Sequence, residues 1–137
     1  MKKFAFVLTV LTAVCATLFA CGAQKQVTVL KESDTYIVIS EIDDFAGKPL
    51  LEAMQAAKDK GELDYTIEGS MVTSMNGVEN AADYSSCWMI YTDDENFSNT
   101  AWGEIEYDGK TCGSASKGVS ELIVASGKIY VFVYTEF

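Results

Sequence analysis

The stretch KIYVFVYT, residues 128–135, has the composition of a β-strand with two apolar faces. Successive side chains of a strand point to opposite faces. One face therefore carries three β-branched residues and the other three aromatic residues (Ile129, Val131 and Val133 against Tyr130, Phe132 and Tyr134). A strand that is apolar on both sides is covered on both sides, which predicts a place at or near the centre of a sheet.

One amphipathic helix is predicted between Pro49 and Gly61. Proline suits the first turn of a helix and glycine a C-terminal stop. At helical spacing, apolar and polar residues fall on opposite faces (Leu50, Leu51, Met54 and Ala57 against Glu52, Gln55, Lys58 and Asp59). A single helix with one apolar stripe needs a sheet to bury it, so the sequence predicts an α+β domain.

Further strands and turns complete the predicted sheet. Strands are expected at Val27–Lys31 and Tyr36–Ile42, and the apolar run 37–39 indicates that the second strand is covered on both faces. Three dipeptides are typical of tight hairpin turns (Asn76-Gly77, Asp108-Gly109 and Ser126-Gly127). The second turn places Tyr107 opposite Lys110 and Ile105 opposite Cys112. The third would pair Val119–Ala125 with the last strand.

The N-terminus has the pattern of an export signal. Lys2 and Lys3 precede an apolar run that ends in Leu18-Phe19-Ala20-Cys21, which resembles a bacterial lipobox with a bulky residue at one position. We therefore expect residues 1–20 to be a lipoprotein signal peptide, 21–26 a tether lipidated on Cys21, and 27–137 a domain on the extracytoplasmic face of the cell membrane. A plain secretory signal with Cys21 incidental, or an uncleaved anchor, are the alternatives.

The net charge of the chain restricts the classes of partner that it can bind. Its 137 residues contain 20 acids, 10 lysines, no arginine and no histidine, for a net charge of −10. Loss of Lys2 and Lys3 with the signal would take this from −10 to −12. Such a charge argues against a nucleic-acid partner. It also leaves the acyl chains as the expected membrane contact. The missing histidine removes the commonest general base and metal ligand, and we expect no metal site and no catalytic residues.

Two cysteines remain in the mature chain, Cys87 and Cys112. In an exported domain they can form a disulfide, which would stabilise the fold by roughly 3 kcal/mol on the chain-entropy model. The alternative is two buried free thiols. Two thiols without histidine do not make a zinc site.

Three aromatic residues are candidates for ligand binding. Trp88 shares a strand face with Ile90, and Tyr91 shares the other with Met89. Either ring could be a platform for a ring-shaped or sugar ligand, whereas the alternative for Trp88 is packing in the core against the helix. Trp102 is predicted on a loop, where an aromatic residue is a reasonable contact residue.

One acidic stretch is a weaker candidate. Asp93-Asp94-Glu95-Asn96 offers clustered oxygen atoms that could hold calcium, but the spacing lacks the alternation and central glycine of an EF-hand loop. The favoured interpretation is a solvated acidic loop.

The order of these elements resembles the transcobalamin-like C-terminal domain family of bacterial surface lipoproteins and eukaryotic cobalamin carriers. Four segments over residues 27–137 carry the resemblance (Pro49–Ala53, Ser70–Gly77, Cys87–Tyr91 and Gly127–Tyr134). It implies a β-grasp-like fold, in which a mixed or antiparallel sheet partly wraps the helix, and a corrinoid such as cobalamin as a candidate ligand. The chain lacks the large helical domain of the carriers, and its segment 92–101 is longer and more acidic than the family pattern.

The sequence thus predicts a non-enzymatic module that binds a soluble ligand at the membrane surface, without a cofactor other than a corrinoid ligand. A display or adhesion domain that contacts proteins or glycans is the alternative. Carboxylate-based glycoside hydrolysis is the enzymatic activity that the residues leave open.

Overall fold

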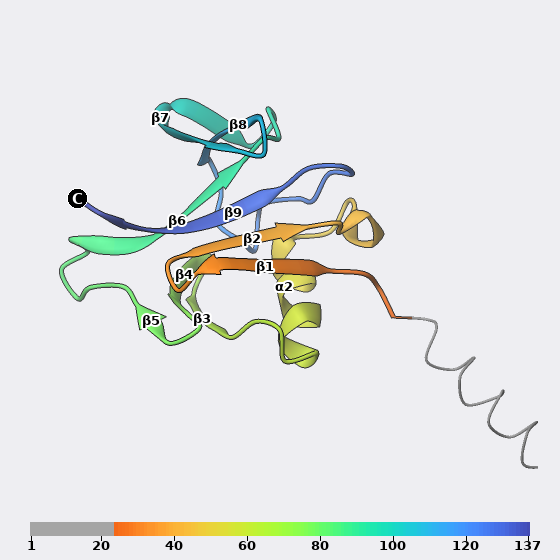
Figure 1. Ribbon diagram of the computed structural model, residues 1–137, viewed down its shortest axis with the longest axis horizontal. Coiled ribbons are helices and arrows are strands. Elements are labelled where there is room, and N and C mark those ends of the chain that lie inside the picture. The colour runs from red at the N-terminus through yellow and green to blue at the C-terminus, as the bar shows by residue number, and fades with distance from the viewer. Residues whose placement is uncertain (1–23) are drawn as a thin grey trace, which may run out of the picture.

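The computed structural model describes residues 24–137, which form two antiparallel β-sheets and one α-helix (Figure 1). In chain order the elements are β1 (Thr28–Ser33), β2 (Tyr36–Ser40), the 3-10 helix η2 (Asp43–Phe45), α2 (Leu50–Asp59), β3 (Tyr65–Glu68), β4 (Met71–Met75), β5 (Val78–Glu79), β6 (Ser86–Thr92), β7 (Ser98–Tyr107), β8 (Lys110–Ala115) and β9 (Tyr130–Glu136). The α+β prediction is confirmed. The predicted signal peptide and Cys21 lie outside the described residues.

The larger sheet has the strand order β1-β2-β9-β6-β8-β7. β9 pairs with β2 on one edge and with β6 along seven residues on the other. The predicted central position of the C-terminal strand is therefore confirmed. Its physical cause is visible in the burial of Tyr130, Val131 and Phe132, which are all fully buried although they alternate between the two faces.

Helix α2 covers the aromatic face of this sheet. Leu50, Ala53, Met54 and Ala57 are fully buried in one cluster with Ile37, Ile39, Trp88, Tyr130 and Phe132. Pro49 occupies the position just before the helix rather than its first turn. In Figure 1, α2 and the small sheet lie below the strands β1, β2, β9 and β6, and the β7–β8 hairpin lies above them.

The β7–β8 hairpin covers part of the second face. A smaller cluster forms there around Val38, Tyr91, Cys112, Ile129 and Val131, with Ile105 and Tyr107 of β7 packed against it. The Asp108-Gly109 turn has the predicted register, since Tyr107 lies opposite Lys110 and Ile105 opposite Cys112. The turn of the hairpin is therefore a tight two-residue turn. The hairpin extends the large sheet and also packs over one face of it.

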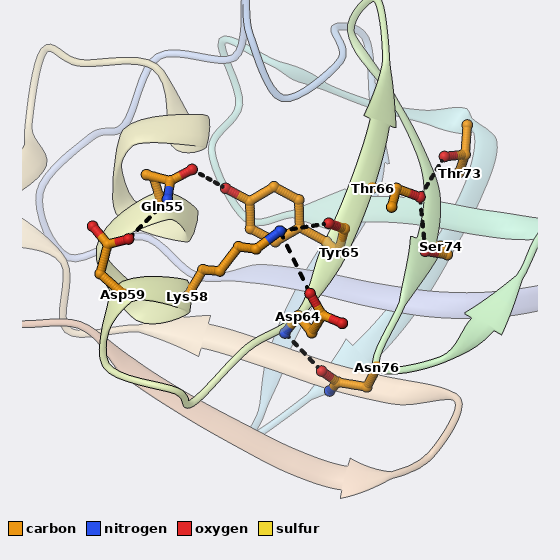
Figure 2. Close-up of polar contacts among 9 residues, drawn as sticks. All are labelled: Gln55, Lys58, Asp59, Asp64, Tyr65, Thr66, Thr73, Ser74 and Asn76. Atoms are coloured by element: carbon orange, nitrogen blue, oxygen red, sulfur yellow. Dashed lines mark hydrogen bonds and ion pairs between the residues drawn. The ribbon is translucent and has the colours of Figure 1, made fainter.

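The second sheet, β3-β4-β5, is tied to the helix by polar contacts (Figure 2). The Tyr65 hydroxyl lies 3.1 Å from Oε1 of Gln55, and the Lys58 ammonium donates a 3.1 Å hydrogen bond to the Tyr65 carbonyl. The predicted Asn76-Gly77 turn joins β4 to β5 with Met75 opposite Val78. The Asn76 side chain also accepts a hydrogen bond from the Asp64 amide.

The predicted hairpin around Ser126-Gly127 is wrong. Residues 119–125 form no strand beside β9; apart from a bridge between Pro49 and Ile123, they are irregular. Their carbonyls instead accept hydrogen bonds from the start of α2, Leu122 from the Leu50 amide at 2.8 Å and Val119 from Leu51 at 3.0 Å. Val119, Leu122 and Val124 fill the core beside the helix, so the apolar pattern reflects helix contacts and not strand pairing.

Candidate functional site

A groove of about 440 Å³ follows the edge of β6 between β4 and the end of β8. Trp88 and Ile90 from one face of β6 line it together with Cys87 and Met89 from the other. Because residues of both faces contribute, the groove follows the edge of the strand and does not lie over one face. Its other walls come from two segments (Glu68, Ser70, Met71 and Val72; Ser114 to Gly118).

The edge of β6 is open because its neighbour covers only part of it. β8 pairs with β6 only at Tyr91 and Thr92. At the other end of the strand, the Ser86 carbonyl accepts a hydrogen bond from the Ala81 amide, and the Trp88 amide donates one to the Asn80 side chain. Between these two ends no strand of residues 24–137 pairs with this edge of β6, whose other edge is paired with β9, and the groove occupies that gap.

Ser70 places an unpartnered polar atom at the groove. Its hydroxyl oxygen is buried and has no hydrogen-bond partner among the described residues. Gly118 approaches it so closely that a Cβ at that position would lie 2.2 Å from the hydroxyl. Buried polar atoms are almost always hydrogen-bonded, so an orphaned hydroxyl calls for an explanation. A polar atom of a ligand in the groove would supply the missing partner only after a small local movement, because the oxygen has almost no exposed area in this structure.

The rest of the groove is suited to binding rather than to covalent chemistry. Met71 presents an exposed apolar side chain, and Glu68 and Lys117 each bring one charge. Burial raises the pKa of the Cys87 thiol, which keeps it protonated and makes it a poor nucleophile. The arrangement combines apolar surface with a few polar atoms, as small-molecule sites do.

Trp88 is a core residue and only borders the groove. It is 4% exposed, and its indole Nε1 donates a 2.8 Å hydrogen bond to the Val78 carbonyl. Its ring packs edge-on against Tyr134 with centroids 5.5 Å apart. Of the two interpretations of Trp88, packing in the core is the one that the structure has, because the ring is buried in the same apolar cluster as α2, and a free aromatic platform is wrong.

Tyr91 and Trp102 lie elsewhere. Tyr91 is buried in the cluster on the opposite face of the sheet, under Gly103 of β7. Trp102 is 66% exposed, but it lies within strand β7 and not on the predicted loop. The pairing of β7 with β8 is interrupted between Asn99 and Glu104, which leaves Trp102 outside the ladder. The three candidate residues are therefore not brought together into one site.

Cys87 and Cys112 are free thiols. Tyr91 lies opposite Ser114, so the register separates the two cysteines by six residues along antiparallel strands. That is roughly 20 Å at a strand rise of ~3.3 Å per residue, whereas a disulfide needs Cα atoms within about 7 Å. The disulfide alternative is wrong for this structure. Burial, with Asp93 nearby, raises the pKa of Cys112 to about 11.

The acidic loop after β6 is solvated only in part, since Glu95 and Asn96 are exposed and Asp93 is half-buried. Asp94 is buried, and its carboxylate accepts a hydrogen bond from the Asn96 amide. The Asp93 carboxylate accepts one from the Ile129 amide at 2.8 Å and lies 3.5 Å from the Lys110 ammonium. These oxygens hold the loop to the start of β9. Among the described residues, no group of three or more acidic or cysteine side chains is arranged to hold a metal ion.

The parts of the groove that sequence reasoning missed are Ser70, Met71 and the gap beside β6. No local signal marks them, because the groove depends on where the pairing of β8 stops. Within residues 24–137 no helix has the length and hydrophobicity needed to cross a bilayer. No protein-family model matches the chain, and no curated protein or solved structure matches it either.

Proposed function

We propose that the chain is a lipid-anchored module on the extracytoplasmic face of a membrane, where it binds a soluble ligand without transforming it. The groove beside β6 is the observation that carries this proposal, because it joins apolar surface to the orphaned Ser70 hydroxyl. The packing of α2 against an antiparallel sheet supports a β-grasp-like fold of the transcobalamin-like group.

The contacts of the tether support an anchor close to the domain. The Gln26 amide donates a hydrogen bond to the Asp44 carboxylate, and the Lys25 ammonium lies 5.0 Å from the centre of the Phe45 ring. The chain from Gln24 onward therefore lies on the domain surface. Only Gly22 and Ala23 separate it from Cys21, a reach of about 10 Å in extended chain. Acyl chains on Cys21 would hold the domain against the membrane.

A Cys21→Ser variant tests this anchor. We expect the wild-type chain to fractionate with membranes and to carry the mass of a diacylated N-terminus, and the variant to keep its signal peptide or to be released. Equal membrane retention of both forms, with no acyl mass on the wild type, would reject lipidation.

A corrinoid is the first ligand to test in the groove. The volume of about 440 Å³ lies within the ~300–1,000 Å³ of small-molecule sites. A whole corrinoid is larger, so the groove would hold one edge of the macrocycle, with Met71 and Ile90 against its apolar rim and Ser70 toward a peripheral amide. Cobalamin and cobinamide both present that edge, and they differ in the nucleotide loop.

Three variants make the titration specific. The chain has two tryptophans, so Trp102→Phe leaves Trp88 as the only tryptophan, at the groove. Saturable binding of cyanocobalamin or cobinamide in equilibrium dialysis, with a corrected change in Trp88 emission, is the expected result. Met71→Arg should block the groove, whereas Leu30→Arg, at another exposed apolar position, should not. Binding that Met71→Arg leaves unchanged would reject this groove as the site.

A display or adhesion domain is the second proposal, favoured by the exposure of Trp102. Trp102 is 66% exposed on an outer strand, and an exposed indole offers a partner a large apolar surface with a hydrogen-bond donor. Loss of partner binding in a Trp102→Ala variant, with groove binding absent in the wild type, would favour this function over the first.

A further inference from the structure

Tyr84 combines high exposure with an unfavourable backbone conformation. Its side chain is 56% exposed, and its φ of 59° lies in the left-handed region. Asn76 and Asp108 share that region, but they are in Asn-Gly and Asp-Gly turns and their short side chains tolerate it. A bulky residue there is an outlier, and such strain clusters at functional positions.

The chain around Tyr84 is fixed by local hydrogen bonds. The Tyr84 amide donates to the Ala81 carbonyl at 2.9 Å. The Ser85 amide and hydroxyl both donate to the Asp83 carboxylate, at 3.0 and 2.7 Å. These hydrogen bonds fix the backbone from which the exposed side chain of Tyr84 projects.

Tyr84 borders a recess of about 220 Å³ between this turn and the small sheet, whose polar walls include Thr66, Thr73 and Glu79. Figure 2 shows the Thr66 hydroxyl between those of Thr73 and Ser74, each 2.8 Å away. A bulge produces this arrangement. Thr66 is paired with Ser74 and Ile67 with Val72, so Thr73 is the extra residue and its hydroxyl turns toward Thr66.

The hydroxyl cluster keeps capacity for a ligand. Three hydroxyls supply three protons, and the two hydrogen bonds among them use two. One donor and several lone pairs remain for a ligand. The exposed Glu79 carboxylate adds an acceptor, and it also disfavours an anionic ligand. By contrast, the Asn80 amide is committed to the Trp88 amide and the Val72 carbonyl, so it forms a fixed wall.

We infer that this recess is a binding site for a neutral saccharide. A pyranose ring would lie with its C–H face on Tyr84, while its hydroxyls exchange hydrogen bonds with Thr66 and Thr73 and donate to Glu79. The volume is below the ~300–1,000 Å³ of drug-sized sites and suits one sugar unit. No residue that lines this recess also lines the groove beside β6, so the site is independent of the function proposed above.

Saturation-transfer difference NMR on the full chain, purified in a detergent without a sugar headgroup, tests the site. The probes are glucose, galactose, mannose and N-acetylglucosamine, with cellobiose, maltose, lactose and chitobiose, and glucuronic acid as the anionic comparison. We expect saturable transfer to the ring protons of at least one neutral sugar, and weaker transfer to glucuronic acid.

Four variants separate a site from adventitious contact. Tyr84→Phe should keep affinity within a few-fold, because the stacking face remains. Tyr84→Ala should lose about tenfold, the equivalent of one aromatic contact. Thr73→Val keeps the shape but removes a hydroxyl and should also weaken binding. Leu30→Ala removes another exposed apolar side chain, outside the recess and the groove, and should change nothing.

Tyr84→Gly tests whether a loss of sugar binding is caused by misfolding. Glycine tolerates the left-handed conformation, so this variant should unfold at a higher temperature than the wild type while it loses sugar binding. The inference is overturned if no neutral sugar in the panel gives transfer. It is also overturned if Tyr84→Ala and Thr73→Val bind as the wild type does, or if Leu30→Ala removes the binding.

Discussion

The Tyr107 hydroxyl donates a 2.9 Å hydrogen bond to the Glu32 carboxylate and so joins β7 to β1, the two outermost strands of the six-stranded sheet. The Tyr107 ring also lies 6.2 Å from the ring of Tyr36 on β2. The sheet therefore curls until its two edges approach each other. The small apolar cluster around Val131 is enclosed by this curvature.

Removal of this contact should loosen the β7–β8 hairpin. Tyr107→Phe keeps the ring and loses one exposed hydrogen bond, so we expect a change within about 1 kcal/mol. Tyr107→Ala also loses the ring packing and should speed amide hydrogen exchange in β8. Trp102→Ala, on the same strand but exposed, is the control. Unchanged exchange in Tyr107→Ala would show that the sheet holds its curvature without this residue.

Truncation of the two tryptophans should have very different effects on stability. Trp88→Ala removes a buried ring and its hydrogen bond to Val78, and we expect a loss of about 3–5 kcal/mol in the free energy of unfolding. Trp102→Ala should change it by no more than about 0.5 kcal/mol. Urea unfolding followed by circular dichroism measures both. Equal losses would contradict the burial of Trp88.

The domain should lose stability above pH 9. The Cys112 pKa is raised from 9.0 to about 11 by burial, so the folded state keeps a proton that the unfolded chain releases. The stabilising contribution is present in full below pH 9 and is lost as the pH rises toward 11, by roughly 2 kcal/mol. Tyr130, whose pKa burial raises from 10.0 to about 12, adds a similar loss at higher pH.

Urea unfolding of the wild type and Cys112→Ala between pH 8 and 10.5 checks this prediction. The variant should show a shallower decline over that range, because it has no thiol to ionise. Parallel declines in the two proteins would assign the alkaline instability to other groups.

Tyr84→Gly should raise the free energy of unfolding by about 1 kcal/mol, because a left-handed backbone costs a bulky residue about 1–2 kcal/mol that glycine avoids. Asn76→Gly is the matched control in the same backbone region, and its gain should be smaller since asparagine tolerates that region and Asn76 binds the Asp64 amide. Thermal unfolding compares them. A loss of stability in Tyr84→Gly would show that ring contacts outweigh the strain.

Reduction should leave the domain unchanged. With Cys87 and Cys112 as free thiols, dithiothreitol has no bond to break within residues 24–137, and the melting temperature should be the same with and without it. A thiol reagent should react slowly with the folded chain and quickly in guanidinium, because both pKa values are raised. A marked drop in melting temperature on reduction would contradict the separation of the two cysteines.

Local sequence patterns determined those elements whose own periodicity or turn residues specify them. The helix after Pro49, the central strand at the C-terminus and the Asp108-Gly109 turn with its register follow from periodicity and turn chemistry. Residues 119–125 misled the same reasoning, because an apolar run beside a turn is typical of a strand and also of a segment that fills a core. Only contacts with α2 distinguish these two cases.

Tertiary structure alone decided where the groove beside β6 and the polar recess beside Tyr84 lie. The groove exists because β8 leaves β6 after two paired residues, and the polar recess exists because a bulge turns Thr73 toward Thr66. It also decided that Trp88 is buried in the core and that Trp102 is exposed on strand β7 and not on a loop. Periodicity reports which residues of one element face the same way, whereas a site depends on which elements meet, and that is fixed by packing over long distances in the chain.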